Sequence, residues 1–141
     1  MKEFRVKNHM IDSVLTIGPD TTLPEASQIM KAKGVRRLPV VKNGKLVGIV
    51  SLTDIQEASP SDATSLSIWE MNYLLSQLKI SNIMTKDPIS VTEETPMGDV
   101  ARLMLENKIG GIPVVNADGG VAGIITESDI FRLIVSEWSE N

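Results

Sequence analysis

Hydrophobic residues along this chain form short runs separated by polar turns, and the same order of runs occurs twice. In the first occurrence, Val14–Ile17 predicts an extended segment, and the apolar residues Ala26, Ile29 and Met30 then follow helical spacing. Two strands are predicted on either side of Asn43-Gly44, because this dipeptide between β-branched runs is typical of a hairpin turn. A closing helix follows, so the predicted order of elements is β-α-β-β-α.

The two occurrences are related residue by residue, as in an internal duplication. Leu38-Pro39-Val40-Val41 recurs as Ile112-Pro113-Val114-Val115, an offset of 112 − 38 = 74 residues. Gly48-Ile49-Val50-Ser51 recurs as Gly123-Ile124-Ile125-Thr126, an offset of 123 − 48 = 75, so the second copy has gained one residue in the turn. A copy of about 45 residues is too small to bury both faces of a sheet alone. We therefore predict an α/β (α+β) fold of two pseudo-symmetric repeats packed through their sheets.

The expected boundaries are residues 1–56 for the first repeat with its N-terminal segment, 57–79 for a linker and 80–141 for the second repeat. Thr21 and Thr95 are predicted N-caps of the first helix in each repeat, because a threonine oxygen can accept a free amide of the first turn. Pro96 suits the first helical position that follows Thr95.

The linker is expected to contain a loop and a helix. Ala58–Asp62 is a loop by composition, and Ser67 with Glu70 predicts a capping box at a helix start. Trp69 and Tyr73 lie on one side of this helix and could mark a dimer contact. The neighbouring face is predicted to pack on the core through Ile68, Met71, Leu75 and Leu78.

Composition and charge narrow the classes of function. The formal net charge of −4 argues against non-specific binding to nucleic acids, which needs clustered Lys and Arg. The sequence contains no Cys, which rules out disulfide scaffolds and thiolate metal sites and fits a cytoplasmic location. No secretory signal is visible, and no apolar run approaches the ~20 residues that span a bilayer. We expect neither a nucleic-acid partner nor a membrane partner.

No enzymatic constellation is visible. His9 is the single histidine, expected at the surface or at a helix end, and it has no second His or Cys with which to bind a metal. Asp54 and Asp129 are equivalents in a repeat rather than a paired acid and base. Neither a Walker loop nor a G-x-S-x-G elbow occurs. We expect no catalytic residue, no metal site, no required cofactor and no enzymatic activity.

The residues that could bind a ligand are Gly48-x-x-Ser51-x-x-Asp54 and the copy Gly123-x-x-Thr126-x-x-Asp129. In each copy a hydroxyl stands where a strand ends and a helix begins, so the hydroxyl and free amides could hold a phosphate. The Asp one turn later could accept the two hydroxyl groups of a ribose. The alternative is plain helix capping by the Ser or Thr with an acid in the first turn.

These motifs resemble the CBS-domain family, and the tandem resembles the regulatory pair called a Bateman module. The resemblance rests on the Val6–Met10 segment and its copy, on the Leu-Pro-Val-Val and Ile-Pro-Val-Val strands, and on the Gly-x-x-[Ser/Thr]-x-x-Asp motifs. It covers nearly the whole chain. The linker is also similar to that of bacterial proteins of the acetoin-utilisation type, which often carry a further C-terminal domain.

The resemblance implies a regulatory ligand of the adenosine type, such as AMP, ADP, ATP or S-adenosylmethionine, bound in clefts between the CBS repeats. Phosphate and ribose would be held by Ser51 with Asp54, and by Thr126 with Asp129. The adenine would lie against apolar walls formed by Val14, Leu38, Pro39, Pro88, Ile89, Ile112 and Pro113.

The two predicted sites differ where a phosphate would lie. Arg36 and Arg37 precede the strand in the first repeat, and Gly110 and Gly111 take the same positions in the second. Two guanidinium groups can bind phosphate through charge-assisted hydrogen bonds, whereas Gly111 offers room and an amide but no charge. The first site is therefore expected to prefer a phosphorylated ligand, and the second to take a less charged one or to stay empty. The resemblance also implies an alternative, in which Arg36 and Arg37 bind the phosphate of a ligand seated in the second repeat.

The main alternative is a dimerisation or interaction scaffold that binds no ligand. The resemblance implies a homodimer in either case. An effector protein, or a C-terminal domain missing from this chain, would be the output partner.

Overall fold

The computed structural model describes residues 4–59 and 66–139, so residues 60–62 of the predicted Ala58–Asp62 loop lie outside the described part. The described residues form a mixed α+β protein with two three-stranded sheets, which confirms the predicted fold class. Contacts divide the chain into two compact units. One unit comprises residues 15–87, and the other comprises residues 1–14 together with residues 88–141. The boundaries between the units, after residues 14 and 87, therefore lie within the segments that precede the first predicted helix of each repeat.

The unit of residues 15–87 contains an antiparallel sheet of order β1-β2-β3. Asn43 and Gly44 take φ angles of 51° and 76° in the hairpin between β1 and β2, as the dipeptide predicts. The extended segment predicted at Val14–Ile17 is reduced to a single parallel bridge from Ile17 to Val40. The elements are α1 (Leu23–Lys33), β1 (Arg37–Lys42), β2 (Lys45–Ser51), α2 (Leu52–Ala58), α3 (Ile68–Gln77), α4 (Ile80–Ile83) and β3 (Thr85–Lys86).

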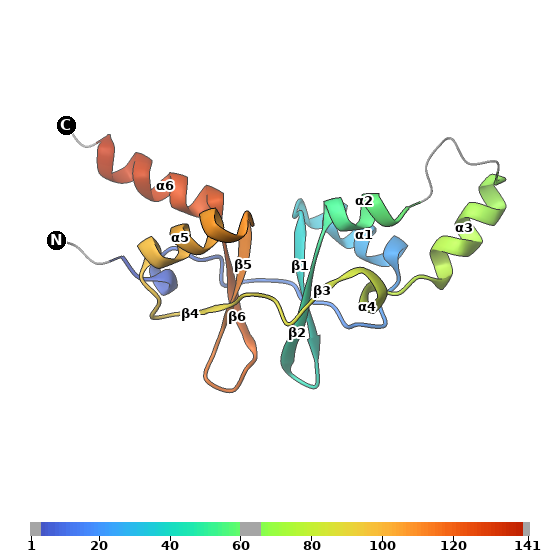
Figure 1. The fold of residues 1–141 in the computed structure, drawn as a ribbon, viewed down its shortest axis with the longest axis horizontal. Helices are drawn as coiled ribbons and strands as arrows, with labels where there is room; N and C mark the ends of the chain where they lie inside the picture. The colour runs from blue at the N-terminus through green and yellow to red at the C-terminus, as the bar shows by residue number, and fades with distance from the viewer. Residues whose placement is uncertain (1–3, 60–65, 140–141) are drawn as a thin grey trace. The chain divides into compact units, whose positions relative to one another are not determined.

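The other unit contains a sheet of order β4-β5-β6, in which β4 runs parallel to β5 and β6 runs antiparallel to it. Helices α5 and α6 lie on the same side of this sheet (Figure 1). The elements are the 3₁₀ helix η1 (Val6–Asn8), β4 (Val91–Thr92), α5 (Met97–Asn107), β5 (Gly111–Val115), β6 (Val121–Thr126) and α6 (Glu127–Trp138).

Each sheet is completed by the segment that precedes the other repeat. Ile11 and Ile124 exchange two backbone hydrogen bonds of 3.0 Å at the edge of β6, and β3 pairs with β2 at the equivalent place. Val6 is 0% exposed in the core of the unit that contains β5 and β6, and Ile80, 80 − 6 = 74 residues later, is 0% exposed in the core of the other unit. The sequence analysis used these segments as motifs but did not predict this exchange.

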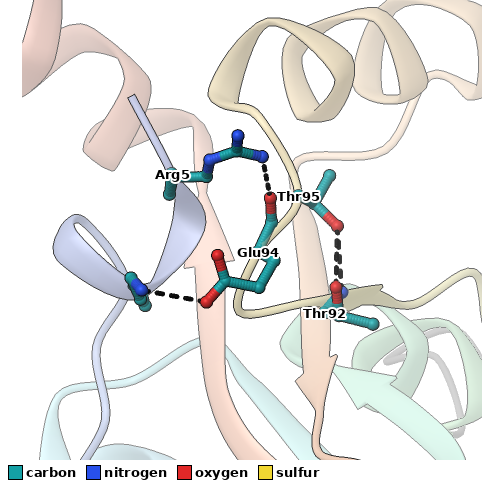
Figure 2. A network of polar contacts seen from close by, with 5 residues as sticks. Arg5, Thr92, Glu94 and Thr95 are labelled. Atoms are coloured by element: carbon teal, nitrogen blue, oxygen red, sulfur yellow. Dashed lines mark hydrogen bonds and ion pairs between the residues drawn. The ribbon is translucent and has the colours of Figure 1, made fainter. Parts of the chain in front are cut away.

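Polar contacts also hold the N-terminal segment in place (Figure 2). The Arg5 guanidinium donates to the Glu94 carbonyl at 2.6 Å, and the Lys7 ammonium lies 2.9 Å from the Glu94 carboxylate. The hydrogen bond and charge of Lys7 lower the pKa of Glu94 from its ordinary value of 4.5. Glu94 therefore joins the N-terminal segment to the turn before α5.

The helix starts of the two repeats differ from the predictions by one residue. The N-cap of α1 is Thr22, not Thr21, and its side chain accepts from the Glu25 amide. The N-cap of α5 is Pro96, not Thr95, so Pro96 precedes the first helical residue. Thr95 instead accepts a hydrogen bond from the Thr92 amide, as Figure 2 shows. Thr22 thus caps α1, whereas Thr95 stabilises the turn that precedes α5.

Helix α3 is less buried than its apolar pattern predicts. The capping box of Ser67 and Glu70 is confirmed. Leu75 and Leu78 pack against the core of residues 15–87, but Ile68 is 69% exposed, and α3 contains no buried residue. The prediction of one fully packed face was therefore wrong for the first turn of the helix.

Candidate functional site

The first candidate site begins where β2 ends. Ser51 is the N-cap of α2, and its amide donates to Asp54 Oδ2 at 2.8 Å while the Asp54 amide donates to Ser51 Oγ at 3.0 Å. The capping alternative is therefore realised in the structure. Capping leaves Asp54 Oδ1 and the hydroxyl hydrogen of Ser51 without a partner within residues 4–59 and 66–139. Both groups remain able to bind a ligand.

Two arginines lie beside this motif. Arg37 pairs directly with Ser51 across β1 and β2, and residues paired in this way present their side chains on the same face, with Cβ atoms about 5 Å apart. The Arg36 carbonyl accepts from the Leu52 amide at 2.8 Å, which fixes the chain just before β1. In the described part of the chain, neither guanidinium makes a hydrogen bond or an ion pair. Arg37 therefore lies opposite Ser51 with Arg36 beside it in the chain, and neither guanidinium has a partner among the described residues.

The equivalent place in the second repeat has the same backbone but different side chains. Gly111 pairs with Thr126, and the Glu127 amide donates to the Gly110 carbonyl at 3.1 Å. The Thr126 amide donates to Asp129 Oδ2 at 2.8 Å. Asp129 is 4% exposed. The backbone arrangement is therefore the same in the two repeats, but the second repeat lacks the two guanidinium groups.

The residues predicted to form the adenine walls differ widely in exposure. Leu38 and Ile112 are 1% and 0% exposed and lie in the cores of their units, and Pro39 and Pro113 are also fully buried. Val14 and Pro88 are half-buried, and Ile89 is exposed. The backbone of Pro39 is tied to Ile17, whose amide donates to the Pro39 carbonyl at 3.1 Å. Contact of any of these residues with an adenine remains a prediction.

The described residues contain no candidate metal site. Within this part of the chain, no group of three His, Cys, Asp or Glu side chains converges on one point. His9 is the residue that ends η1, as expected for a helix-end histidine, and its ring contacts Phe4 edge-on at 5.7 Å. No described helix combines the length and the apolar character needed to cross a membrane.

An apolar groove of about 320 Å³ runs between α5 and α6, within one unit. Met104, Leu105, Ile130 and Phe131 are among its lining residues. Leu105 and Phe131 are 81% and 60% exposed. None of the predicted nucleotide-binding residues lines this groove, so its apolar surface is separate from the candidate site.

The repeats match a known protein family. A sequence model of the CBS domain matches residues 6–61 and 80–136. The chain belongs to the CBS-domain family. It is a CBS pair, since both repeats match and solved CBS pairs have the same fold. A CBS domain-containing protein of Dictyostelium discoideum is 34% identical over 131 residues, which cover 92% of this chain and 90% of the relative. The chain spans less than half the length of four other relatives. One of them is an inosine-5′-monophosphate dehydrogenase from Korarchaeum cryptofilum, of which the chain spans 24%.

Solved CBS pairs connect this fold with adenosine compounds. The CBS pair of protein MJ0100, in complex with 5′-methylthioadenosine and S-adenosyl-L-methionine, has a TM-score of 0.80 and 30% identity and covers 96% of this chain and 99% of its own. CBSX2 of Arabidopsis thaliana in complex with AMP has the same TM-score and identity over 94% of this chain and 97% of its own. AcuB of Vibrio cholerae, assigned to acetoin utilization, has a TM-score of 0.78 and 29% identity over 98% of this chain and 95% of its own. The resemblance to acetoin-utilisation-type CBS pairs is thereby confirmed.

Proposed function

We propose that this CBS pair is a non-catalytic regulatory module that binds an adenosine nucleotide. The observation that carries the proposal is the position of Arg37, which lies directly opposite Ser51 at the end of β2 and has no partner among the residues that the structure describes. An isolated capping box needs no neighbouring guanidinium. A bound phosphate is stabilised by one, because Arg binds phosphate through charge-assisted hydrogen bonds. Solved relatives that bind AMP and S-adenosyl-L-methionine support the adenosine class of ligand.

In the proposed site, each group has one role. Arg36 and Arg37 bind the phosphate together with the Ser51 hydroxyl, whose hydrogen is free to be donated. Asp54 accepts the ribose hydroxyl groups through the oxygen that capping leaves unused. Because the same residues also cap α2, ligand binding adds hydrogen bonds without breaking those that hold the helix start.

Thermal unfolding in the presence of adenosine, AMP, ADP, ATP, S-adenosylmethionine and GTP tests the proposal. At about a hundredfold over the dissociation constant, a ligand adds ~2.7 kcal/mol to the free energy of unfolding. In a chain of this size, that is a rise of roughly 5–10 °C in the midpoint. A rise limited to adenosine compounds supports the sensor function. No rise with any compound refutes it and favours a scaffold whose Ser51 and Asp54 only cap a helix.

A pair of variants assigns the phosphate contact. Arg36→Ala/Arg37→Ala is expected to weaken AMP binding at least tenfold while leaving adenosine binding nearly unchanged, since adenosine carries no phosphate. Lys31→Ala/Lys33→Ala is the matched control, because it removes the same charge from the exposed last turn of α1. AMP affinity that is unchanged by loss of the arginines would remove the basis of the proposed phosphate site. The same purified samples, incubated with ATP and analysed for ADP and AMP, test the absence of catalysis.

We further propose that the pair forms a homodimer through the apolar surface of α5 and α6. The exposed side chains of Leu105, Phe131 and Val135 support this assignment. Phe131→Glu places a charge on that surface and is expected to convert a dimer to a monomer in light scattering. A wild-type dimer that Phe131→Glu leaves intact would place the interface elsewhere, for instance at the exposed Trp69 and Tyr73 of α3. A monomeric wild-type protein would refute the homodimer.

A further inference from the structure

Asp54 and Asp129 occupy equivalent positions, 129 − 54 = 75 residues apart, but their neighbours use the two carboxylates differently. Asp129 Oδ2 accepts from the Thr126 amide at 2.8 Å and from the Thr126 hydroxyl at 3.2 Å, and Asp129 Oδ1 accepts from Arg132 Nη2 at 2.7 Å. The carboxylate of Asp54 accepts from the Ser51 amide alone among the described residues. Asp129 is thus bound on both oxygens, and Asp54 on one.

The difference follows from one residue on each closing helix. Arg132 lies one turn after Asp129 in α6 and forms an ion pair with it. The equivalent position in α2 is 132 − 75 = 57, which is Glu57. Glu57 is exposed and forms no ion pair with the part of the chain that the structure describes. A carboxylate at that place cannot donate to Asp54, so Asp54 Oδ1 has no donor among the described residues.

Counting acceptor positions shows the consequence for a ribose. An ionised carboxylate offers about four lone-pair positions to hydrogen-bond donors. Three donors at Asp129 leave about one position, whereas the single donor at Asp54 leaves about three. A vicinal diol donates two hydrogen bonds. Asp54 can accept both of them as it stands, and Asp129 can do so only after Arg132 has withdrawn.

Burial and the hydroxyl groups strengthen the contrast. The Asp129 side chain is 3% exposed and is paired with Arg132, whose side chain is 66% exposed, whereas Asp54 is half-buried. The Thr126 hydroxyl donates its hydrogen to Asp129. The Ser51 hydroxyl accepts from the Asp54 amide and keeps its hydrogen for a ligand. In the second repeat, therefore, neither the carboxylate nor the hydroxyl is ready to bind.

We propose that Arg132 is a specificity-determining residue, which competes with the ribose diol of a ligand for Asp129. The first repeat then holds the tighter adenosine site, and the second repeat binds an adenosine ligand only by displacing Arg132. This inference rests on the proposed function, because it assumes that Asp54 and Asp129 are the groups that bind ribose. It assigns to residues 57 and 132 a role in setting the relative affinity of the two sites.

Calorimetric titration with adenosine and with AMP tests the inference on one site at a time. Asp54→Asn weakens the first site and leaves the second to be observed. Adding Arg132→Met removes the competing donor but keeps an apolar stem of similar length. Asp54→Asn/Arg132→Met is expected to bind adenosine about tenfold more tightly than Asp54→Asn, as when a charge-assisted hydrogen bond no longer has to be broken. The control is Asp54→Asn/Arg102→Met, since Arg102 also pairs with an Asp three residues away, Asp99, but on the exposed surface of α5.

The converse variant does not depend on the stability of Asp129 without its partner. Glu57→Arg in an Asp129→Asn background is expected to weaken adenosine binding by the first site about tenfold, because the new arginine can reach Asp54 as Arg132 reaches Asp129. Wild-type protein that binds adenosine, with affinities that neither Arg132→Met nor Glu57→Arg alters, overturns this inference alone. Arg132→Met that weakens AMP but not adenosine also overturns it, and makes Arg132 a phosphate ligand. No binding by wild-type protein or any variant overturns the proposed function as well.

Discussion

Val6→Ala is expected to weaken the unit that contains the second repeat, although Val6 precedes the first repeat in the sequence. Val6 is 0% exposed and packs in the core with residues of α5, β5 and β6. The substitution removes two methyl groups, which accounts for ~1.6 kcal/mol of transfer free energy, and the cavity left behind raises the loss to about 2–3 kcal/mol.

Amide hydrogen exchange, read residue by residue, locates the effect. Loss of about 2–3 kcal/mol is expected to speed exchange of the most protected amides of β5 and β6 roughly 30- to 150-fold. Ile80→Ala, at the equivalent position, is expected to act instead on β1 and β2, because Ile80 packs in the core of residues 15–87. Val35→Ala is the control, since it deletes the same two methyl groups from a side chain that is 38% exposed and lies outside both the core and the proposed dimer surface.

The reasoning is refuted if Val6→Ala speeds exchange in β1 and β2 while β5 and β6 keep their protection. It is equally refuted if β5 and β6 are as well protected in Val6→Ala as in Val35→Ala. Either result would mean that the N-terminal segment does not complete the sheet of the second repeat.

Three further predictions concern single residues. Gly123→Ala is expected to lower the free energy of unfolding by about 1–3 kcal/mol, because its Cβ would lie 2.5 Å from the Ile11 carbonyl oxygen. In contrast, Gly98→Ala in α5 meets nothing within 4 Å and is expected to raise the free energy of unfolding by about 0.5–1 kcal/mol. Chemical denaturation measures both changes. Ser51→Ala is expected to cost about 1 kcal/mol through loss of the N-cap, and Ser51→Asn, which retains a cap, separates that loss from any effect on AMP affinity. Glu94→Gln is expected to lower the thermal midpoint at pH 7, because a carboxyl with a lowered pKa stabilises the fold only while it is ionised. The difference in midpoint from wild-type protein should vanish as the pH falls below 4.5. A difference that grows in acid would contradict this assignment.

Local sequence patterns predicted the repeated elements well, because each pattern had a local cause. Asn43-Gly44 specifies its hairpin through the φ angles that these two residues accept. Ser51 and Asp54 lie three residues apart, which is the spacing of a capping box. The difference between Thr21 and Thr22 shows the limit of such signals, since two adjacent threonines offer the same chemistry and tertiary contacts decide between them. Here the Ile80 amide donates to the Thr21 carbonyl.

The contacts that complete each sheet could not be predicted locally. Nothing in the segment Val6–Met10 specifies that its partner is Gly123, where the missing side chain leaves room for Met10 and for the Ile11 carbonyl. A glycine in a strand is a general sign of close approach, but it does not identify the approaching segment. In the candidate site, Ser51, Asp54 and Arg37 were predicted from motif and charge, and their role in binding stays a prediction. The pairing of Arg132 with Asp129 was missed, although the i, i+3 spacing of an acid and a base on a helix is a readable signal.

The pairing of Ile11 with Ile124 also sets an order of events during synthesis. The first eleven residues leave the ribosome early, but their partner strand is made 124 − 11 = 113 residues later. At about 5–20 residues per second, the delay is roughly 6–20 seconds. The three strands and the core cluster of the unit of residues 15–87 are all made within that interval, so this unit can fold first. Arg5, Val6 and Lys7 can bind residues 93–95 before β6 is made, but Ile11 must wait until β6 has emerged, so the edge of this sheet is completed last.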